Sequence, residues 1–266
     1  MTAGCVTSTE ILEKIKLIEK RDNIEALFSC EAGSRAWGYG SPISDHDVRV
    51  VYIKPLQEYL RVETVDDFIP DHSFACSFGK IDMAGWDLRK ALYLLRKSNV
   101  NLLEWVFSPV CYQETTGIVD QLKEFSKQYI YPKSVVFHCT AVSERVVKDH
   151  LKMPRVKVSS YFKAIRPLLQ AQVLLSSLQF EVDVNKLLVL AVLPTQVRAR
   201  ISALKDAVSS LDTELVDWID AEIRRLRSIA DMQPPKVIPP SDHLDKFFCD
   251  MVIMHDRSRI LGQSSF

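Results

Sequence analysis

The chain has 266 residues, of which 34 are Lys or Arg and 34 are Asp or Glu, so its formal net charge is zero. Hydrophobic residues make up 47% and charged residues 26%, which is typical of a folded globular protein and excludes a disordered chain. A neutral chain is also poorly suited to coating nucleic acid with its whole surface, although local basic patches can still bind it.

No segment is suited to crossing a membrane. The longest wholly apolar run, Leu187–Leu193, is far shorter than the roughly 18 residues that span a bilayer. The N-terminus lacks the basic-then-apolar pattern of a secretory signal, and the six cysteines form no C-x-x-C pair that would indicate a zinc site. We therefore expect a cytoplasmic, intracellular protein without a membrane partner, whose cysteines are buried free thiols.

The N-terminal part of the chain predicts one helix and two strands. Residues 9–20 have apolar side chains at helical spacing and predict an amphipathic helix. Residues 24–30 and 45–53 are rich in strand-forming residues, and residues 38–44 between them are typical of a loop. The expected order is therefore helix, strand, loop, strand.

A third strand and a helix follow. Residues 78–86 alternate, with Phe78, Lys80 and Asp82 on one face and Gly79, Ile81 and Met83 on the other, and so predict a strand. Residues 88–97 predict a helix for which Asp87 is the expected N-cap. Five of the eight glycines lie between residues 33 and 85, where tight turns are needed. This part of the chain is expected to hold the sheet.

Beyond residue 131 the sequence predicts helices, and no glycine occurs from Ile118 to Leu261. Helical patterning covers residues 134–152, 159–180, 184–193, 195–209 and 212–230. Two Pro-Pro pairs then form a stiff connection to a last amphipathic segment. We expect a strand-containing domain over 1–130, a helical domain over 131–232, and a Pro-rich connection with a C-terminal amphipathic helix over 233–266.

Asp45 and Asp47 are the first candidates for chemistry. Residues two apart in a strand point to the same face, so these carboxylates project together while His46 and Val48 point the other way. Neighbouring carboxylates repel unless a proton, a salt bridge or a cation neutralises them. Their oxygen ligands favour Mg²⁺, and two such ions can hold the attacking and leaving oxygens of a nucleotidyl transfer. We expect two Mg²⁺ ions, with Mn²⁺ as a substitute.

A third carboxylate is normally needed to complete such a site. Asp82 is the preferred candidate because it occupies a polar position of the alternating strand. Asp87 is the alternative, although a helix cap explains it more simply. Glu31 could tune Arg35 or a metal-bound water, or could form a structural salt bridge.

Gly33 and Ser34 are candidates for binding phosphate. A strand followed by Gly-Ser and a helical turn through Arg35 presents backbone N–H groups and a hydroxyl group at a helix N-terminus. Arg49 lies on the same strand face as the two aspartates, so it either contacts phosphate or balances the carboxylates.

Residues 145–166 form a basic stretch, with seven Lys and Arg residues and one Asp. It is either a solvated helix face or a wall that binds triphosphate or RNA. Lys157, Tyr161, Lys163 and Arg166 are the candidate nucleotide-binding residues, because near-helical spacing can gather them on one face.

The motif Gly33-Ser34, eleven residues, then Asp45-His46-Asp47 resembles the signature of the polymerase-β-type nucleotidyltransferase superfamily, which has a later third Asp. The wider pattern resembles the predicted nucleotidyltransferases called RNA-ligase-associated. It comprises residues 31–38, 44–49 with Tyr52, 85–92, 97–99, Glu104-Trp105, Ser108-Pro109 and 161–168. The resemblance implies an α+β fold, with a small mixed β-sheet nucleotidyltransferase core and helices followed by a helical C-terminal domain.

The resemblance also implies a reaction, transfer of an NMP from an NTP to an acceptor hydroxyl with release of pyrophosphate. In that reading Asp45 and Asp47 bind both metals, and Asp82 joins one of them and receives the acceptor proton. An RNA 3′ end is the favoured acceptor because of the basic stretch. The alternatives are an antitoxin-like enzyme that modifies a protein hydroxyl and a nucleotide-sensing module without turnover.

Overall fold

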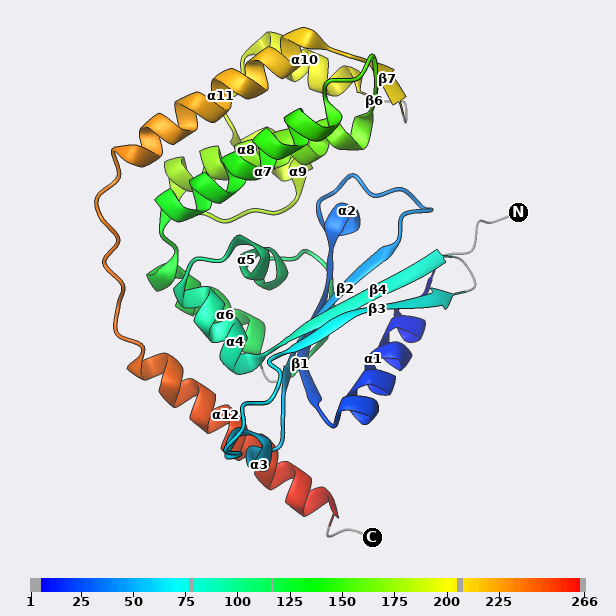
Figure 1. Cartoon of the computed structure of the whole chain (residues 1–266), viewed down its shortest axis with the longest axis vertical. Coiled ribbons are helices and arrows are strands. Elements are labelled where there is room, and N and C mark those ends of the chain that lie inside the picture. Colours follow the sequence, from blue (N-terminus) through cyan, green and yellow to red (C-terminus); the bar gives the residue numbers. More distant parts are fainter. Residues whose placement is uncertain (1–5, 77–78, 116, 205–207, 264–266) are drawn as a thin grey trace. The chain divides into compact units, whose positions relative to one another are not determined.

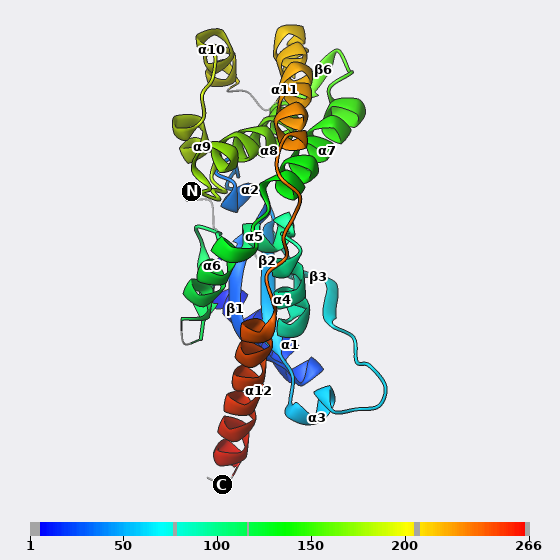
Figure 2. The same cartoon turned by 90° about the vertical axis from the view of Figure 1, so that its left-hand side faces the viewer.

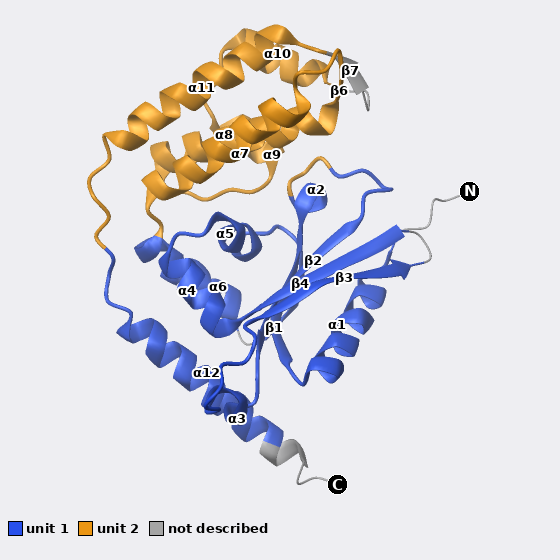
Figure 3. Ribbon diagram, viewed as in Figure 1, with its two compact units in different colours: residues 1–36, 40–129, 238–266 blue, residues 37–39, 130–237 orange. Residues whose placement is uncertain are grey.

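A computed structural model describes residues 6–76, 79–115, 117–204 and 208–263. The chain forms two compact units (Figure 3): unit 1 comprises residues 1–36, 40–129 and 238–266, and unit 2 comprises residues 37–39 and 130–237. The chain thus passes from unit 1 to unit 2 after Tyr129, one residue before the expected end of the strand-containing domain.

Unit 1 is built on a five-stranded mixed sheet in the order β3-β4-β2-β1-β5 (Figure 1). Its strands are β1 Glu25–Ala32, β2 His46–Ile53, β3 Phe68–Cys76, β4 Gly79–Asp87 and β5 Cys111–Glu114. Strands β2 and β4 run parallel, and the other neighbouring pairs run antiparallel. The three predicted strands are confirmed with shifts of one or two residues, residue 78 lying outside the described part, whereas β3 and β5 were not predicted.

Helices cover both faces of this sheet (Figures 1 and 2). Helix α1 (Ser8–Asp22) packs on one face, where its isoleucines join a core with Val48 and Val50 of β2. Helices α4 (Leu88–Arg96), α5 (Val100–Val106) and α6 (Ile118–Tyr129) contact the strands from the other side. Two four-residue helices, α2 (Gly33–Ala36) and α3 (Leu56–Tyr59), follow β1 and β2.

Side-chain caps define the first residues of helices α1 and α4. Thr7 and Glu10 form a reciprocal capping box at the start of α1, in which the Glu10 N–H donates to Thr7 Oγ1 over 3.2 Å. Asp87 caps α4 by accepting a 2.8 Å hydrogen bond from the Arg89 N–H, and its other carboxylate oxygen accepts one of 2.7 Å from the Tyr59 hydroxyl. The predicted role of Asp87 as an N-cap is therefore confirmed.

Unit 2 is mostly helical, as the sequence predicted, although residues 208–209 of the predicted helix 195–209 lie in a strand. Its helices are α7 Pro132–His150, α8 Val158–Ser177, α9 Val184–Leu190, α10 Thr195–Ala203 and α11 Thr213–Asp231, with a small ribbon of β6 Arg155–Lys157 and β7 Val208–Ser210. Helix α7 packs against both α8 and α11. Among the described residues, no helix combines the length and the apolar character needed to cross a bilayer.

The C-terminal helix α12 (Asp242–Gln263) returns to unit 1 after the proline-rich connection. Phe248 meets the Tyr59 ring edge-on at 5.2 Å, and the Arg89 guanidinium lies 5.0 Å from both rings. The sequence treated residues 233–266 as a segment of their own, because the partners of α12 are far away in the chain. Of the described cysteines, Cys30 and Cys139 are buried, Cys76 is half-buried, and Cys111 and Cys249 are exposed, so the expectation of buried thiols was wrong for the last two. Cys5 lies outside the described residues.

Candidate active site

Two carboxylates meet where the parallel strands β2 and β4 lie side by side. Asp47 and Asp82 are paired in the strand register, so their side chains leave the same face of the sheet. Their side chains are partly buried, with exposed fractions of 32% and 26%. Asp45 is exposed and lies two residues before Asp47, just ahead of β2. The structure therefore places Asp82 beside Asp47, as expected from the sequence.

The opposite face of the same strand is part of the core. His46 and Val48 are buried there, whereas Asp47 and Arg49 are only partly buried. This is the alternation that the sequence predicted for residues 45–48. It holds the carboxylates on one side of the sheet and anchors the strand by its other side.

Arg49 places a positive charge close to Asp47. Its Nη2 lies 3.5 Å from Asp47 Oδ1, and its Nη1 donates 3.0 Å hydrogen bonds to the main-chain oxygens of Val48 and Asp82. Arg49 thus balances a carboxylate and ties β2 to β4. Burial nevertheless raises the pKa of Asp47; Arg49 opposes this shift, while the negative charges of Glu31, Asp82 and Asp45 add to it.

Asp82 has a more favourable environment. Its carboxylate accepts a 2.5 Å hydrogen bond from the Ser73 hydroxyl and lies 2.9 Å from Lys80 Nζ. Burial acts to raise the pKa of Asp82, but the bonds from Ser73 and Lys80 outweigh it and the net shift is downward. The pKa values of the two neighbouring carboxylates are therefore shifted in opposite directions, and Asp47 is the one whose ionised form is disfavoured.

The residues present fit a divalent cation that arrives with phosphate. Among the described residues, no three Asp, Glu, His or Cys side chains gather closely enough to form a complete metal cage. Mg²⁺, however, is commonly held by one or two carboxylates and completes its octahedron with water and substrate oxygens. The carboxylate oxygens of Asp47 and Asp82 provide that kind of partial ligand set.

The Gly33-Ser34 turn lies directly against Asp47. Gly33, the residue directly after β1, has a φ of +61°, a conformation that residues other than glycine rarely adopt. A Cβ atom on Gly33 would fall 2.0 Å from Asp47 Oδ2, which is well inside van der Waals contact. The backbone of the turn and the carboxylate can approach this closely only because residue 33 has no side chain.

Arg35 holds the loop that follows this turn. Its Nε and Nη2 donate to the Ser44 carbonyl over 3.0 and 2.8 Å, and Nη2 also donates to the Pro42 carbonyl over 3.1 Å. The sequence predicted Arg35 as a nucleotide ligand. In the structure its guanidinium fixes the backbone that leads into Asp45, and its role as a nucleotide ligand stays a prediction.

The four candidates from the basic stretch belong to unit 2, and the structure does not gather them on one surface. Lys157 and Lys163 are exposed. Tyr161 is fully buried, and its hydroxyl accepts a 2.8 Å hydrogen bond from the Asp212 N–H. Arg166 is 5% exposed, with its guanidinium 4.2 Å from the centroid of the Trp37 ring. Tyr161 and Arg166 are therefore interior residues of unit 2.

The segment Trp37–Tyr39, which follows α2, is held within unit 2 by its backbone and its rings. The Trp37 carbonyl accepts a 2.9 Å hydrogen bond from the Val184 N–H, and the Gly38 carbonyl accepts one of 3.1 Å from Asn185 Nδ2. Tyr39 stacks on Phe162 with the ring centroids 5.4 Å apart. Trp37 is thus half-buried within unit 2, with the Arg166 guanidinium over its ring.

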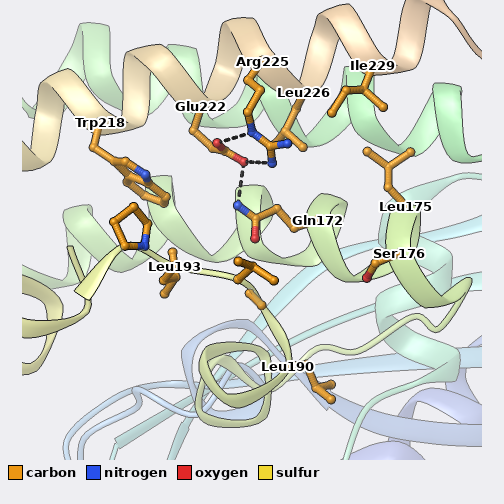
Figure 4. Close-up of a pocket in the computed structure, with 13 residues that line it drawn as sticks. Gln172, Leu175, Ser176, Leu190, Leu193, Trp218, Glu222, Arg225, Leu226 and Ile229 are labelled. Atoms are coloured by element: carbon orange, nitrogen blue, oxygen red, sulfur yellow. Dashed lines mark hydrogen bonds and ion pairs between the residues drawn. The ribbon is translucent and has the colours of Figure 1, made fainter. Parts of the chain in front are cut away.

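Unit 2 also has a groove of about 730 Å³, whose walls are largely apolar (Figure 4). Glu222 is buried in this groove and accepts hydrogen bonds from Gln172 Nε2 over 2.6 Å and from two nitrogens of Arg225 over 2.8 and 2.6 Å. Its carboxylate is neutralised and hydrogen-bonded by these neighbours. Glu222 is the only carboxylate among the described residues that line the groove, so the candidate active site is the Asp47–Asp82 pair.

Ser73 and Lys80 were not predicted from the sequence as partners of Asp82. The spacing of Lys80 could have indicated this contact, because it lies two residues before Asp82 on the same strand face. No sequence pattern indicated the contact of Ser73, because β3 was not predicted and only the β3–β4 register brings Ser73 opposite Asp82.

A mixed sheet with aspartates on neighbouring strands beside a Gly-Ser turn is the arrangement of a polymerase-β-type nucleotidyltransferase. The model of the family described as "RNA repair pathway DNA polymerase beta family", RlaP, matches residues 7–250. The chain belongs to this family, which confirms the resemblance seen in the sequence.

Two individual proteins are also similar to the chain. The uncharacterized protein YcgL of Bacillus subtilis (strain 168) is 32% identical over 235 residues, which cover 83% of this chain and 86% of YcgL. A nucleotidyltransferase-like protein from Exiguobacterium sibiricum 255-15 has 10% sequence identity and a TM-score of 0.31, with coverage of 86% of this chain and 69% of that protein.

Proposed function

We propose that the chain is a metal-dependent nucleotidyltransferase that transfers an NMP from an NTP to an acceptor hydroxyl with release of pyrophosphate. The observation that carries the proposal is the Asp47–Asp82 pair on parallel strands, with the Gly33 backbone against Asp47. Asp45, which is exposed and lies two residues before Asp47, is the proposed third carboxylate. Family membership supports the same reaction class.

The residues of this site would act by binding and orientation. Asp45, Asp47 and Asp82 would hold Mg²⁺, or Mn²⁺ in its place, and the ion would supply charge neutralisation at the transferred phosphoryl group. Gly33 and Ser34 would bind the phosphates with backbone N–H groups and a hydroxyl. Because phosphoryl transfer asks for little covalent chemistry from the protein, positioning and electrostatics would account for most of the rate.

Nucleotide binding is expected to require the metal, because a triphosphate and paired carboxylates repel unless cations lie between them. Titration calorimetry with each NTP should give binding in Mg²⁺ and a loss of about tenfold or more in excess chelator. Equal affinity in both conditions would contradict a site centred on Asp45 and Asp47.

An RNA 3′ end is the proposed acceptor, supported by the family description and by the exposed cations of the basic stretch. The test supplies labelled NTP with small RNA, with lysate protein, or with neither. Label in RNA supports the proposal. Label in protein assigns the chain to protein modification instead, and tight NTP binding without any turnover assigns it to nucleotide sensing.

The cations Lys157 and Lys163 provide a separate prediction about RNA. Replacing both with alanine should weaken RNA binding and lower the salt slope of the binding constant, because each phosphate contact releases counterions. Lys186, another exposed lysine of unit 2, is the matched control. Binding and salt slope that match wild type would show that Lys157 and Lys163 are only solvated charges.

A further inference from the structure

Glu31 is a buried carboxylate that lies behind the candidate active site. It is 1% exposed, although it is near the end of β1 and beside the Gly33-Ser34 turn. Its Oε1 accepts a 2.7 Å hydrogen bond from the main-chain N–H of Asp47. Its Oε2 lies 2.7 Å from His46 Nδ1 and accepts a hydrogen bond from the Tyr112 hydroxyl.

These contacts join three strands at one point. Glu31 is on β1, His46 and Asp47 are on β2, and Tyr112 is on β5. Glu31 pairs with Val48 in the β1–β2 register, so its side chain lies on the buried face of the sheet, opposite the face that carries the Asp47 side chain. Glu31 therefore reaches Asp47 through the backbone and cannot be a ligand on the same face.

Among the described residues, His46 is the only basic side chain within ion-pair distance of Glu31, and its Nδ1 faces Glu31 Oε2. Tyr112 donates a hydrogen bond without adding charge. In the described part of the chain, this buried carboxylate therefore has no Lys or Arg side chain paired with it.

We propose that Glu31 is a positioning residue for the nucleotide and metal site, a role that rests on the function proposed above. Its hydrogen bond fixes the main chain of Asp47, and its buried charge adds to the negative potential that attracts a divalent cation. Glu31 does this from behind the sheet without touching metal or substrate. A carboxylate that served only to join the strands would not need to be charged.

Glu31→Gln separates these roles because glutamine keeps the size of the side chain and an acceptor for the Asp47 N–H. Removal of one buried charge near a divalent cation should raise the Mg²⁺ concentration for half-maximal transfer by about tenfold. Tyr112→Phe is the matched control, because it removes one bond from the same carboxylate and leaves the charge in place. It should lower the melting temperature and keep the wild-type Mg²⁺ half-saturation.

Three outcomes are distinguishable. A raised Mg²⁺ requirement in Glu31→Gln, but not in Tyr112→Phe, supports the inference. Wild-type Mg²⁺ half-saturation and kcat in Glu31→Gln, with only a lowered melting temperature, would show that Glu31 only joins the strands and would overturn the inference. Absence of Mg²⁺-dependent transfer and nucleotide binding in the wild type refutes the proposed function itself.

If Glu31→Gln does not fold, Glu31→Asp is the variant to measure. The shorter side chain keeps the charge but withdraws the acceptor from the Asp47 N–H. A fall in kcat at an unchanged Mg²⁺ half-saturation supports positioning through the backbone of Asp47. Wild-type kcat in this variant contradicts it.

Discussion

Replacing Asp47 with asparagine is expected to abolish nucleotidyl transfer without unfolding the protein. Asparagine keeps the size of the side chain but removes the charge that would hold the cation, so transfer should fall by about 10³-fold or more. The melting temperature should stay constant or rise, because burial and the charges of Glu31, Asp82 and Asp45 already disfavour the ionised form of Asp47. Label transfer and thermal unfolding measure the two effects.

Asp82→Asn and Asp87→Asn complete this comparison. Asp82→Asn should also abolish transfer, because Asp82 is the carboxylate paired with Asp47. Asp87 is a buried N-cap with bonds from Arg89 and Tyr59, and asparagine caps a helix nearly as well as aspartate, so Asp87→Asn should stay active. Normal transfer by Asp47→Asn would contradict the mechanism; an active Asp82→Asn with a dead Asp87→Asn would contradict only the choice of third carboxylate.

Gly33→Ala is expected to remove both nucleotide binding and transfer. A methyl group there would lie 2.0 Å from Asp47 Oδ2, so either the turn or the carboxylate has to move. The positive φ adds strain, and the two effects together should cost about 1–3 kcal/mol of unfolding free energy. Calorimetric NTP binding and thermal unfolding measure them.

Gly117→Ala is the matched control for this variant. Gly117 also has a positive φ, +68°, but a Cβ atom there would meet nothing within 4 Å. It should show a comparable backbone penalty with wild-type NTP affinity. Normal NTP affinity in Gly33→Ala would contradict the assignment of this turn to phosphate.

The sequence was sufficient for those parts of the site that depend on local pattern. Alternation placed Asp47 and Arg49 opposite the buried His46 and Val48, because a strand has a strict two-residue period. The cap signal at Asp87 depends only on the helix that follows it. Neither prediction required knowledge of a distant segment.

Tertiary partners could not be predicted in this way. Ser73 meets Asp82 through the β3–β4 register, and Tyr112 meets Glu31 from a strand 81 residues later. Charge and spacing suggested a shared face for Lys157, Tyr161, Lys163 and Arg166. The structure separates them, because packing of α8 takes Tyr161 and Arg166 into the interior.

The most direct test compares two positions of label in the same NTP. Purified protein is incubated with Mg²⁺, acceptor RNA and NTP labelled at either the α- or the γ-phosphate, with Asp47→Asn as the inactive reference. We expect the α-label to enter the acceptor only when Mg²⁺ is present, and the γ-label to leave as pyrophosphate in equal amount. Entry of the γ-label into an acceptor, or transfer of α-label that persists in Asp47→Asn, would contradict the proposed function.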